Sequence, residues 1–318
     1  MTERRHAGRR WFSRAVAVGL AALCGACGQG HPGRPLGLGP PARLPVSRSS
    51  RVAIIVMENK EAPLVIGNSS APYETALARH YGLATRSYGV THPSLPNYLA
   101  LTSGSTHGVS SDCTDCAIAA TNLVDQLEAA RISWRAYLEG YPGDCFTGAG
   151  SGGYAKKHDP FVYYEDVARS PGRCAHLVGF GALTRDLRRG TLPRFVWITP
   201  NLCDDTHDCG VGAGDRFIAG LVPALIHELG PDGFLVITWD EGTTGAGCCA
   251  GAAAGGRIAT IVAGPGARQG ARDRRPVDHY GVLRTIEDAL GLPRLGAAAD
   301  PANGSLRALL AHPPPLRS

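Results

Sequence analysis

One serine in the sequence is bracketed by prolines at the start of an apolar stretch. It is Ser94, in the segment His92-Pro93-Ser94-Leu95-Pro96-Asn97-Tyr98. Both prolines fix the backbone angle φ and lack an N–H donor, so we expect a turn that opens a helix over Asn97–Thr102. A hydroxyl beside a helix N-terminus is well placed to attack a bound phosphate or carboxylate, because that end of a helix attracts anions. The alternative is a structural turn with a serine cap.

Two neighbours of Ser94 could take part in the same chemistry. Asn97 lies three residues further on and can offer its amide N–H to the same anion. His92 is close enough to be a candidate for substrate binding. We therefore treat Ser94 as the candidate nucleophile and these two residues as candidate phosphate contacts.

The elements that must position these residues are predicted from runs of apolar, β-branched residues, which are typical of strands buried on both faces. Such runs cover Val52–Met57, Arg194–Thr199, Phe234–Trp239 and Ile258–Ala263, with a weaker candidate at Ile132–Tyr137. Helical patterns lie between them at Ala71–Tyr81, Asn122–Arg131, Phe180–Arg188, Asp215–Leu229 and Tyr280–Leu290. The alternation predicts one α/β domain over residues 51–318, an α/β/α sandwich around a mostly parallel sheet.

Carboxylates and amides follow two of the predicted strands. Glu58-Asn59 follows the first strand, and Asp240-Glu241 follows Phe234–Trp239. Ligands bind at the carboxyl ends of parallel strands, and these oxygen atoms suit a hard divalent cation. Such a cation could lower the pKa of the serine and bind a phosphoryl oxygen. Taken singly, each acid could instead be a helix cap or a surface carboxylate.

Further polar groups follow the other predicted elements. Asp205 and His207 lie beyond Arg194–Thr199, and Asp278-His279 comes after Ile258–Ala263. Lys157-His158 follows the glycine-rich residues 148–153. Each could be an ordinary loop residue, but their joint occurrence after successive apolar runs indicates one site.

The motifs together resemble those of the bacterial phosphoesterase family, which holds secreted acid phosphatases and phospholipases C within the alkaline-phosphatase-like superfamily. The resemblance covers roughly residues 52–292. It rests on Met57-Glu58-Asn59, His92 to Tyr98, Tyr154 to His158, Thr199-Pro200-Asn201 with Asp205-Thr206-His207-Asp208, Thr238-Trp239-Asp240-Glu241 and His279-Tyr280.

The resemblance implies roles for these positions. Ser94 falls at the nucleophile position, with Asn97 as a phosphate ligand. The metal ligands would be Glu58, Asn59, Asp240 and Glu241. The phosphate pocket or a second metal site would be completed by Lys157, His158, Asp205, His207 and His279. The small number of imidazole ligands favours one hard ion, Ca²⁺, Mg²⁺ or Mn²⁺, over Zn²⁺.

These features predict an exported, metal-dependent phosphomonoesterase that acts through a phosphoseryl intermediate on Ser94. One alternative with the same fold is a phospholipase C or other phosphodiesterase, which would need an additional subsite for the second ester group. Another is a surface binding protein without catalysis. The expected partner is a phosphate ester, either a small molecule or a phospholipid headgroup.

The amino-terminal residues resemble an export signal. Residues 1–30 combine a basic start with the apolar run Ala15–Leu23, and Arg9-Arg10 fits a twin-arginine signal. Cys27 ends a lipobox-like segment that has Cys24 where a hydrophobic residue is expected, so a lipid anchor to the membrane and simple cleavage both stay open. Residues 31–50, rich in Pro and Gly, predict a flexible tether.

The charge balance argues against nucleic acid as a partner. Nine arginines and one glutamate give residues 1–51 a net charge of +8, whereas the whole chain carries +5, so the remainder carries about −3. The basic character therefore belongs to the leader, and no cluster of Lys and Arg interleaved with aromatic residues follows it.

Eight cysteines follow the leader, and an even number in an exported protein indicates disulfides. We predict that Cys203 pairs with Cys209 across the loop that carries Asp205 and His207, with a more distant partner such as Cys174 as the alternative. Zinc at Cys113 and Cys116 is the competing interpretation, but no second pair with matching spacing supports it.

Overall fold

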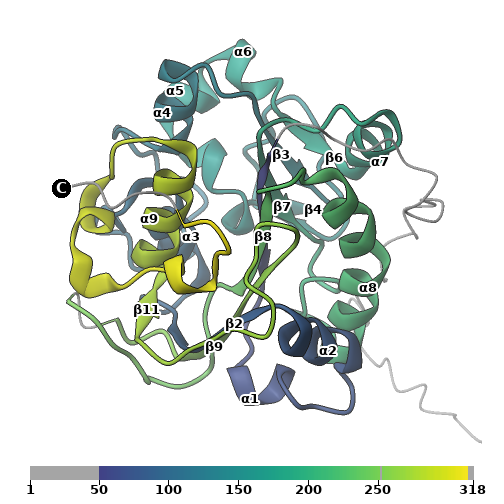
Figure 1. The fold of residues 1–318 in the computed structure, drawn as a ribbon. Coiled ribbons are helices and arrows are strands. Elements are labelled where there is room, and N and C mark those ends of the chain that lie inside the picture. Colours follow the sequence, from purple (N-terminus) through teal and green to yellow (C-terminus); the bar gives the residue numbers. More distant parts are fainter. Residues whose placement is uncertain (1–49, 251–252, 314–318) are drawn as a thin grey trace, which may run out of the picture.

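A mixed sheet of nine strands forms the centre of the protein (Figure 1). The computed structural model describes residues 50–250 and 253–313. The order across the sheet is β10-β2-β9-β8-β1-β7-β3-β6, and β11 pairs with β2. The strands are β1 (Val52–Met57), β2 (Gly82–Tyr88), β3 (Trp134–Leu138), β6 (Leu177–Gly179), β7 (Phe195–Thr199), β8 (Phe234–Trp239), β9 (Arg257–Ala263), β10 (Arg272–Asp273) and β11 (Val277–Asp278). A short hairpin of β4 (Gly150–Ser151) and β5 (Tyr154–Ala155) lies apart from it.

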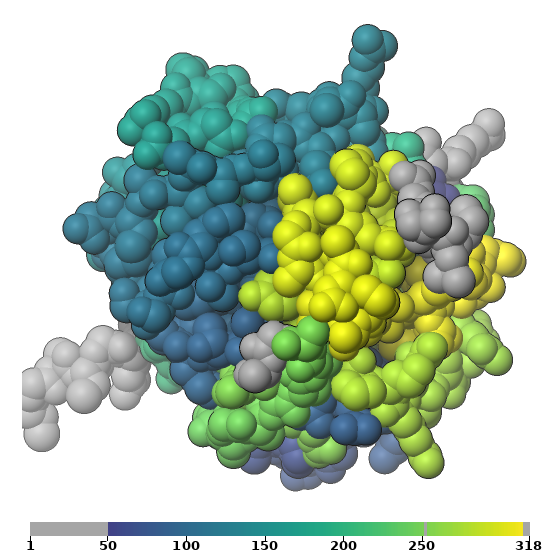
Figure 2. Space-filling model, turned by 90° about the vertical axis from the view of Figure 1, so that its left-hand side faces the viewer, coloured from purple at the N-terminus to yellow at the C-terminus, as the bar shows by residue number. Residues whose placement is uncertain are grey.

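Helices cover both faces of the sheet, which confirms the predicted α/β/α sandwich (Figure 1). One layer contains α3 (Ser94–Ser103), α4 (Leu123–Ala129), α5 (Glu165–Ala168), α6 (Pro171–Cys174) and α9 (His279–Leu290). The other contains α1 (Ala62–Val65), α2 (Pro72–His80), α7 (Phe180–Arg189) and α8 (Val211–Glu228). Figure 2 views the first layer, where the C-terminal part of the chain (yellow) lies beside residues near 100–130 (blue and teal), and α9 packs on α3.

The position of β1 in the middle of the sheet explains why its sequence is apolar at every position. Val52, Ile54 and Val56 pack into the core on the α3 and α9 side. The alternate residues Ala53, Ile55 and Met57 pack into the core on the α8 side. Successive side chains of a strand point to opposite faces, so a strand between two helical layers has no polar position.

One strand of the mostly parallel sheet, β9, runs against its neighbours. The five predicted strands are all present, but β9 runs antiparallel to both β8 and β2. Its carboxyl end is therefore at the opposite edge of the sheet from the site. Asp278 and His279 reach the site instead through β11, which runs parallel to β2. The strands β2 and β6 were not predicted.

The helix that carries Ser94 also differs from the prediction, because it begins at Ser94 rather than at Asn97. Pro96 is therefore the third helical residue and does not open the helix. Proline is tolerated there, since the first N–H groups of a helix have no acceptor within the helix. Ser94 thus belongs to the first turn.

Of the residues that the structure describes, no helix is both long and apolar enough to span a bilayer. The predicted export signal over residues 1–30, with Cys27, lies outside the described residues. So do residues 31–49 of the predicted tether.

A buried carboxyl group in α9 gives the fold a pH-dependent stability. Glu287 is fully buried, its Oε1 accepts the N–H of Leu295 at 2.8 Å, and its Oε2 has no hydrogen-bond partner among the described residues. Burial raises its pKa from 4.5 to about 8. The group is therefore protonated in the folded state over a range where the unfolded chain is ionised.

Replacing Glu287 by Gln is expected to remove this dependence. The stability contributed by the protonated carboxyl is fully present below pH 4.5 and is lost as the pH rises through about 8. The free energy of unfolding of the wild type should therefore fall relative to Glu287→Gln across that window, by at most about 1.4 kcal/mol per pH unit. Urea titrations at several pH values measure this difference. Glu165→Gln on α5 is the control, and parallel curves for Glu287→Gln and wild type would contradict the prediction.

Candidate active site

The hydroxyl of Ser94 lies against a buried carboxylate at the end of β1. Its Oγ donates to Glu58 Oε2 at 3.1 Å, and Tyr98 donates its hydroxyl to Glu58 Oε1 at 2.5 Å. Ser94 and Tyr98 are four residues apart, so they share one face of α3. Only 1% of Ser94 is exposed. The hydroxyl is buried because the first turn of α3 packs directly on the strand ends.

Three carboxyl groups meet at this edge of the sheet. Glu58 follows β1 and Asp240 follows β8, and these strands pair side by side in parallel. The N–H of Glu58 donates to the carbonyl of Asp205 at 2.8 Å, which joins the loop after β7. All three side chains are fully buried. Burial raises the pKa of each, and the mutual repulsion of the group raises the pKa of Glu58 further.

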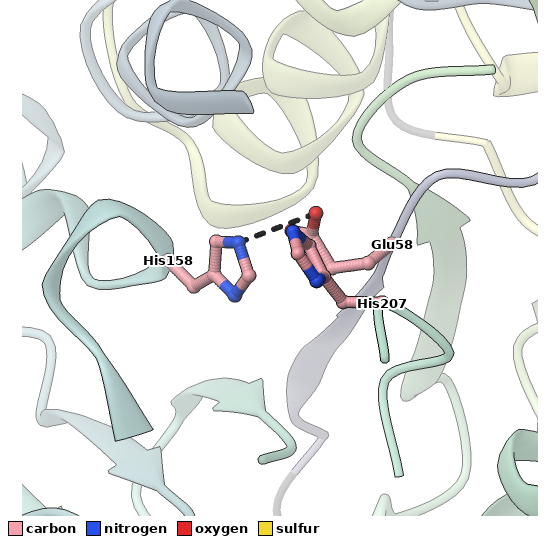
Figure 3. A group of neighbouring side chains, drawn as sticks. All are labelled: Glu58, His158 and His207. Carbon is pink, nitrogen blue, oxygen red and sulfur yellow. Dashed lines mark ion pairs between the residues drawn. The ribbon is translucent and has the colours of Figure 1, made fainter. Parts of the chain in front are cut away.

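A buried histidine bridges two of these carboxyl groups. His158 Nε2 lies 3.3 Å from Glu58 Oε2, and His158 Nδ1 lies 3.2 Å from Asp205 Oδ2. Burial lowers the pKa of His158 well below its usual value, and the positive charge of Lys157 lowers it further. Figure 3 shows that Glu58, His158 and His207 come from separate elements and point toward one another. Their ligand atoms lie within 4.8 Å of one another, as the ligands of one metal ion do.

The cluster has the donor atoms that a divalent cation needs. Several of its buried polar atoms have no hydrogen-bond partner within residues 50–250 and 253–313: Asp205 Oδ2, Asp240 Oδ2, His158 Nε2 and His279 Nδ1. Buried polar atoms in native proteins are nearly always paired, so such a group calls for an explanation. A bound cation would supply the missing partner and offset the repulsion among the carboxylates. The residues present therefore fit a metal ion.

His279 begins α9 and contacts the same cluster. Its Nε2 lies 2.5 Å from the backbone carbonyl of Asp240, which can only accept, so Nε2 carries the proton. This tautomer leaves Nδ1 with a free lone pair. Burial lowers the pKa of His279 to about 4, so the ring is neutral at neutral pH.

His92 and Glu241 form the rim rather than the buried cluster. His92 Nδ1 lies 2.6 Å from Glu241 Oε2, and Nε2 lies 3.1 Å from the carbonyl of Thr244. Although burial opposes the charged form, these two contacts raise the pKa of His92. Burial also raises the pKa of Glu241, to about 7. Because the carboxylate of Glu241 is engaged with His92, its role as a metal ligand stays a prediction.

The two asparagines of the predicted site are held by hydrogen bonds within the protein. The side chain of Asn97 accepts the N–H groups of Val90 and Thr91 and donates to the carbonyls of Thr91 and Pro93. It therefore shapes the turn before Ser94, and phosphate binding by its amide stays a prediction. Asn59 has a φ of 56°, which asparagine tolerates well, and its N–H donates to Asp240 Oδ1 at 3.0 Å.

Lys157 lies on the rim, 23% exposed, and joins three parts of the chain. Its Nζ donates to Asp112 Oδ2 at 3.0 Å and to His207 Nε2 at 3.2 Å. An ammonium group only donates, so His207 Nε2 is the acceptor and His207 Nδ1–H donates to Asp208. Although burial opposes the charged form, the hydrogen bond to Asp112 raises the pKa of Lys157.

Two residues of this region were missed by the sequence analysis. Lys60 donates to the carbonyl of Thr206 at 2.6 Å, and its charge faces the three buried carboxylates. Its position directly after Glu58-Asn59 was a usable signal. Asp112 gave no such signal, because it lies in a loop far in sequence from its partners Leu95 and Lys157.

The disulfides decide the cysteine alternatives. Cys203 pairs with Cys209 across the loop that carries Asp205 and His207, as predicted. Cys174 pairs with Cys145, so the alternative pairing is wrong. Cys113 and Cys116 are joined to each other, which rules out the zinc interpretation for that pair in this structure. The fourth bridge joins the adjacent residues Cys248 and Cys249, beside Asp278.

The fold and this site define the class of protein. A solved structure of an alkaline phosphatase superfamily protein from Vibrio parahaemolyticus aligns with a TM-score of 0.54 and 11% identity, over 81% of this chain and 71% of that one. At this identity the likeness concerns the fold, which is that of the alkaline phosphatase superfamily.

Sequence comparison then gives the family. Residues 56–293 match the Phosphoesterase family, and the chain belongs to it. Phosphatidylinositol-3-phosphatase of Mycobacterium tuberculosis is 31% identical over 253 residues, which are 79% of this chain and 80% of that protein. An acid phosphatase of Aspergillus fumigatus is 30% identical over 227 residues, 67% of this chain and 49% of that protein. The chain is a hydrolase of phosphoric esters.

Proposed function

We propose that this chain is an exported, metal-dependent phosphomonoesterase that acts through a phosphoseryl intermediate on Ser94. The observation that carries the proposal is the hydrogen bond from Ser94 to Glu58, inside a buried cluster of carboxylates and imidazoles with unpaired donor atoms. A serine beside such a cluster combines a nucleophile with groups able to hold a cation.

The metal would be held by Glu58 and Asp240, with Asp205, His158 and His207 as the further donors at hand. Oxygen and imidazole donors suit Ca²⁺, Mg²⁺, Mn²⁺ or Zn²⁺. Once bound, the cation supplies positive charge that stabilises a serine alkoxide and phosphoryl oxygens. Asn59 and Glu241 remain proposed ligands from the sequence.

In the reaction, Ser94 Oγ loses its proton and forms a bond to phosphorus while the bond from phosphorus to the ester oxygen breaks. The departing oxygen keeps the bonding electrons and takes up a proton, so an alcohol leaves. Water then gives up a proton and attacks phosphorus while the bond to Ser94 breaks, Ser94 Oγ takes up a proton, and inorganic phosphate is released. Lys157 lies on the rim beside His207, where its charge can neutralise the phosphoryl oxygens.

The burial of the site favours a monoester over a diester. Ser94 is 1% exposed, and Glu58 and Asp240 are fully buried. A phosphomonoester presents its phosphoryl group at one end and can enter such a site tip first. A diester has a substituent on either side of phosphorus and needs a wider opening, so phospholipase C activity is the second candidate. The family argues against a role in binding without catalysis, because the chain belongs to the Phosphoesterase family.

Export is proposed from the amino-terminal sequence. Residues 1–30 combine arginines with a short apolar run, and the eight later cysteines form four disulfides. Disulfides persist in oxidising compartments, which supports a location outside the cytosol. A lipid on Cys27 would retain the protein at a membrane.

The direct test compares p-nitrophenyl phosphate with bis(p-nitrophenyl) phosphate as substrates. We expect kcat/KM for the monoester to exceed that for the diester by at least about 100-fold, and activity to vanish with EDTA and return with added divalent metal. Equal rates on the two esters would favour the phosphodiesterase, and full activity after dialysis against EDTA would overturn the metal dependence.

A further inference from the structure

Asp112 connects the first turn of α3 to Lys157. Its Oδ1 accepts the N–H of Leu95, the residue after Ser94, at 3.0 Å. Its Oδ2 accepts a hydrogen bond from Lys157 Nζ at 3.0 Å. One carboxylate therefore spans the first turn of α3 and the 3₁₀ turn Lys156–His158. No role follows for Asp112 from the sequence motifs or the family resemblance.

The loop that carries Asp112 is itself held in place. Cys113, the next residue, is bonded to Cys116. Thr114 accepts a hydrogen bond from Lys156 Nζ at 2.6 Å, and the N–H of Ile118 donates to Tyr163 at 2.8 Å. These contacts tie the loop to the segment that contains Lys157, so Asp112 has little freedom to move relative to the lysine.

The ammonium group of Lys157 has two partners at the rim. It donates to Asp112 Oδ2 at 3.0 Å and to His207 Nε2 at 3.2 Å. The side chains of Asp112 and Lys157 are 26% and 23% exposed, so this ion pair lies near the surface. A lysine held by both partners stays on the rim beside His207, where an incoming phosphoryl group would meet it.

We propose that Asp112 is a positioning residue that holds Lys157 at the rim and in register with Ser94. The inference rests on the proposed function. Asp112 does not contact the substrate itself. It acts through Lys157, as residues that orient a binding group generally do, and losing such a residue typically costs about 10- to 100-fold in activity.

Asp112→Asn in the full chain tests the proposal. Asparagine keeps an oxygen for the N–H of Leu95 but loses the charge that holds the ammonium group. We expect kcat/KM for p-nitrophenyl phosphate to fall about tenfold or more, and inorganic phosphate to bind about tenfold more weakly by calorimetry. The control is Asp115→Asn, since Asp115 is exposed within the same disulfide loop and should stay within about twofold of wild type on general grounds.

A double-mutant cycle with Lys157→Met separates positioning from a structural role. If Asp112 acts through Lys157, adding Asp112→Asn to Lys157→Met changes kcat/KM by less than about threefold. If the effects of the two substitutions on kcat/KM multiply, or if Asp112→Asn stays within twofold of wild type, the inference is overturned. The proposed phosphatase activity would still stand. A third outcome is that the wild type does not hydrolyse the ester but binds phosphate, and that Asp112→Asn weakens this binding. That outcome would support the inference and overturn the proposed function. A wild type that neither hydrolyses the ester nor binds phosphate would overturn both.

Discussion

Replacing Ser94 by alanine is expected to lower kcat for p-nitrophenyl phosphate by roughly four orders of magnitude or more, because the attacking atom is removed. The fold should persist. The side chain of Ser94 donates a hydrogen bond to Glu58, and alanine fits the space that the hydroxyl leaves. The free energy of unfolding should therefore fall by about 1 kcal/mol, which corresponds to a change of only a few degrees in the melting temperature.

Covalent trapping gives the mechanistic readout. Acid quenching of the wild type during turnover of a radiolabelled phosphomonoester should leave label on the protein, and peptide mapping should locate it at Ser94. Ser94→Ala should carry none. Ser111→Ala, which alters an exposed serine beside the same site, is the control and should be labelled like the wild type. Label on the Ser94→Ala protein, or activity within threefold of wild type, would show that another group is the nucleophile.

The sequence predicted the strands well where both faces are buried. β1, β7 and β8 are buried at every position, since both helical layers pack on them, and Thr199 and Thr238 alone interrupt their otherwise apolar sequences. β2 was missed because it is partly exposed at its centre, where Thr85 and Arg86 interrupt the apolar run. A pattern of apolar residues reports burial, so a strand with a polar centre gives a weak signal.

The direction of β9 was not predicted from the sequence. Residues 240–256 connect β8 to β9, and the structure describes no helix among residues 240–250 and 253–256. A parallel pair needs a crossover that is usually helical, whereas neighbouring antiparallel strands do not. The absence of a helical pattern in that glycine-rich connection was the usable signal. His279 nevertheless lies at the same edge of the sheet as the other site residues, because β11 precedes it and runs parallel to β2.

Within the site, the motif residues could be predicted but their partners could not. The sequence placed Glu58 and Asp240 after strands, and the pairing of β1 with β8 brings them together. Which way each side chain turns depends on tertiary contacts that leave no local pattern. Glu241 contacts His92, and Asn97 contacts its own turn.

The second large effect is expected from removing two charges of the cluster. The double variant Glu58→Gln, Asp240→Asn keeps the side-chain shapes but leaves few anionic ligands for a divalent cation. We expect its metal content, measured by mass spectrometry, to fall to near zero, and its kcat/KM to fall by about 10³-fold or more. Glu165→Gln combined with Asp232→Asn removes two carboxylates elsewhere and is the control.

The stability of the metal-free proteins distinguishes a metal site from a purely structural cluster. Burial raises the pKa values of Glu58 and Asp240, so their contribution to stability is present at acid pH and is lost as the pH rises through the raised values. At neutral pH in EDTA, the double variant should therefore melt at a higher temperature than the wild type, since it lacks the buried charges. Added metal should stabilise the wild type, because a ligand that binds the folded state raises its stability, and should leave the double variant unchanged. Equal metal content in the two proteins, or full activity of the double variant, would show that the cation is held elsewhere.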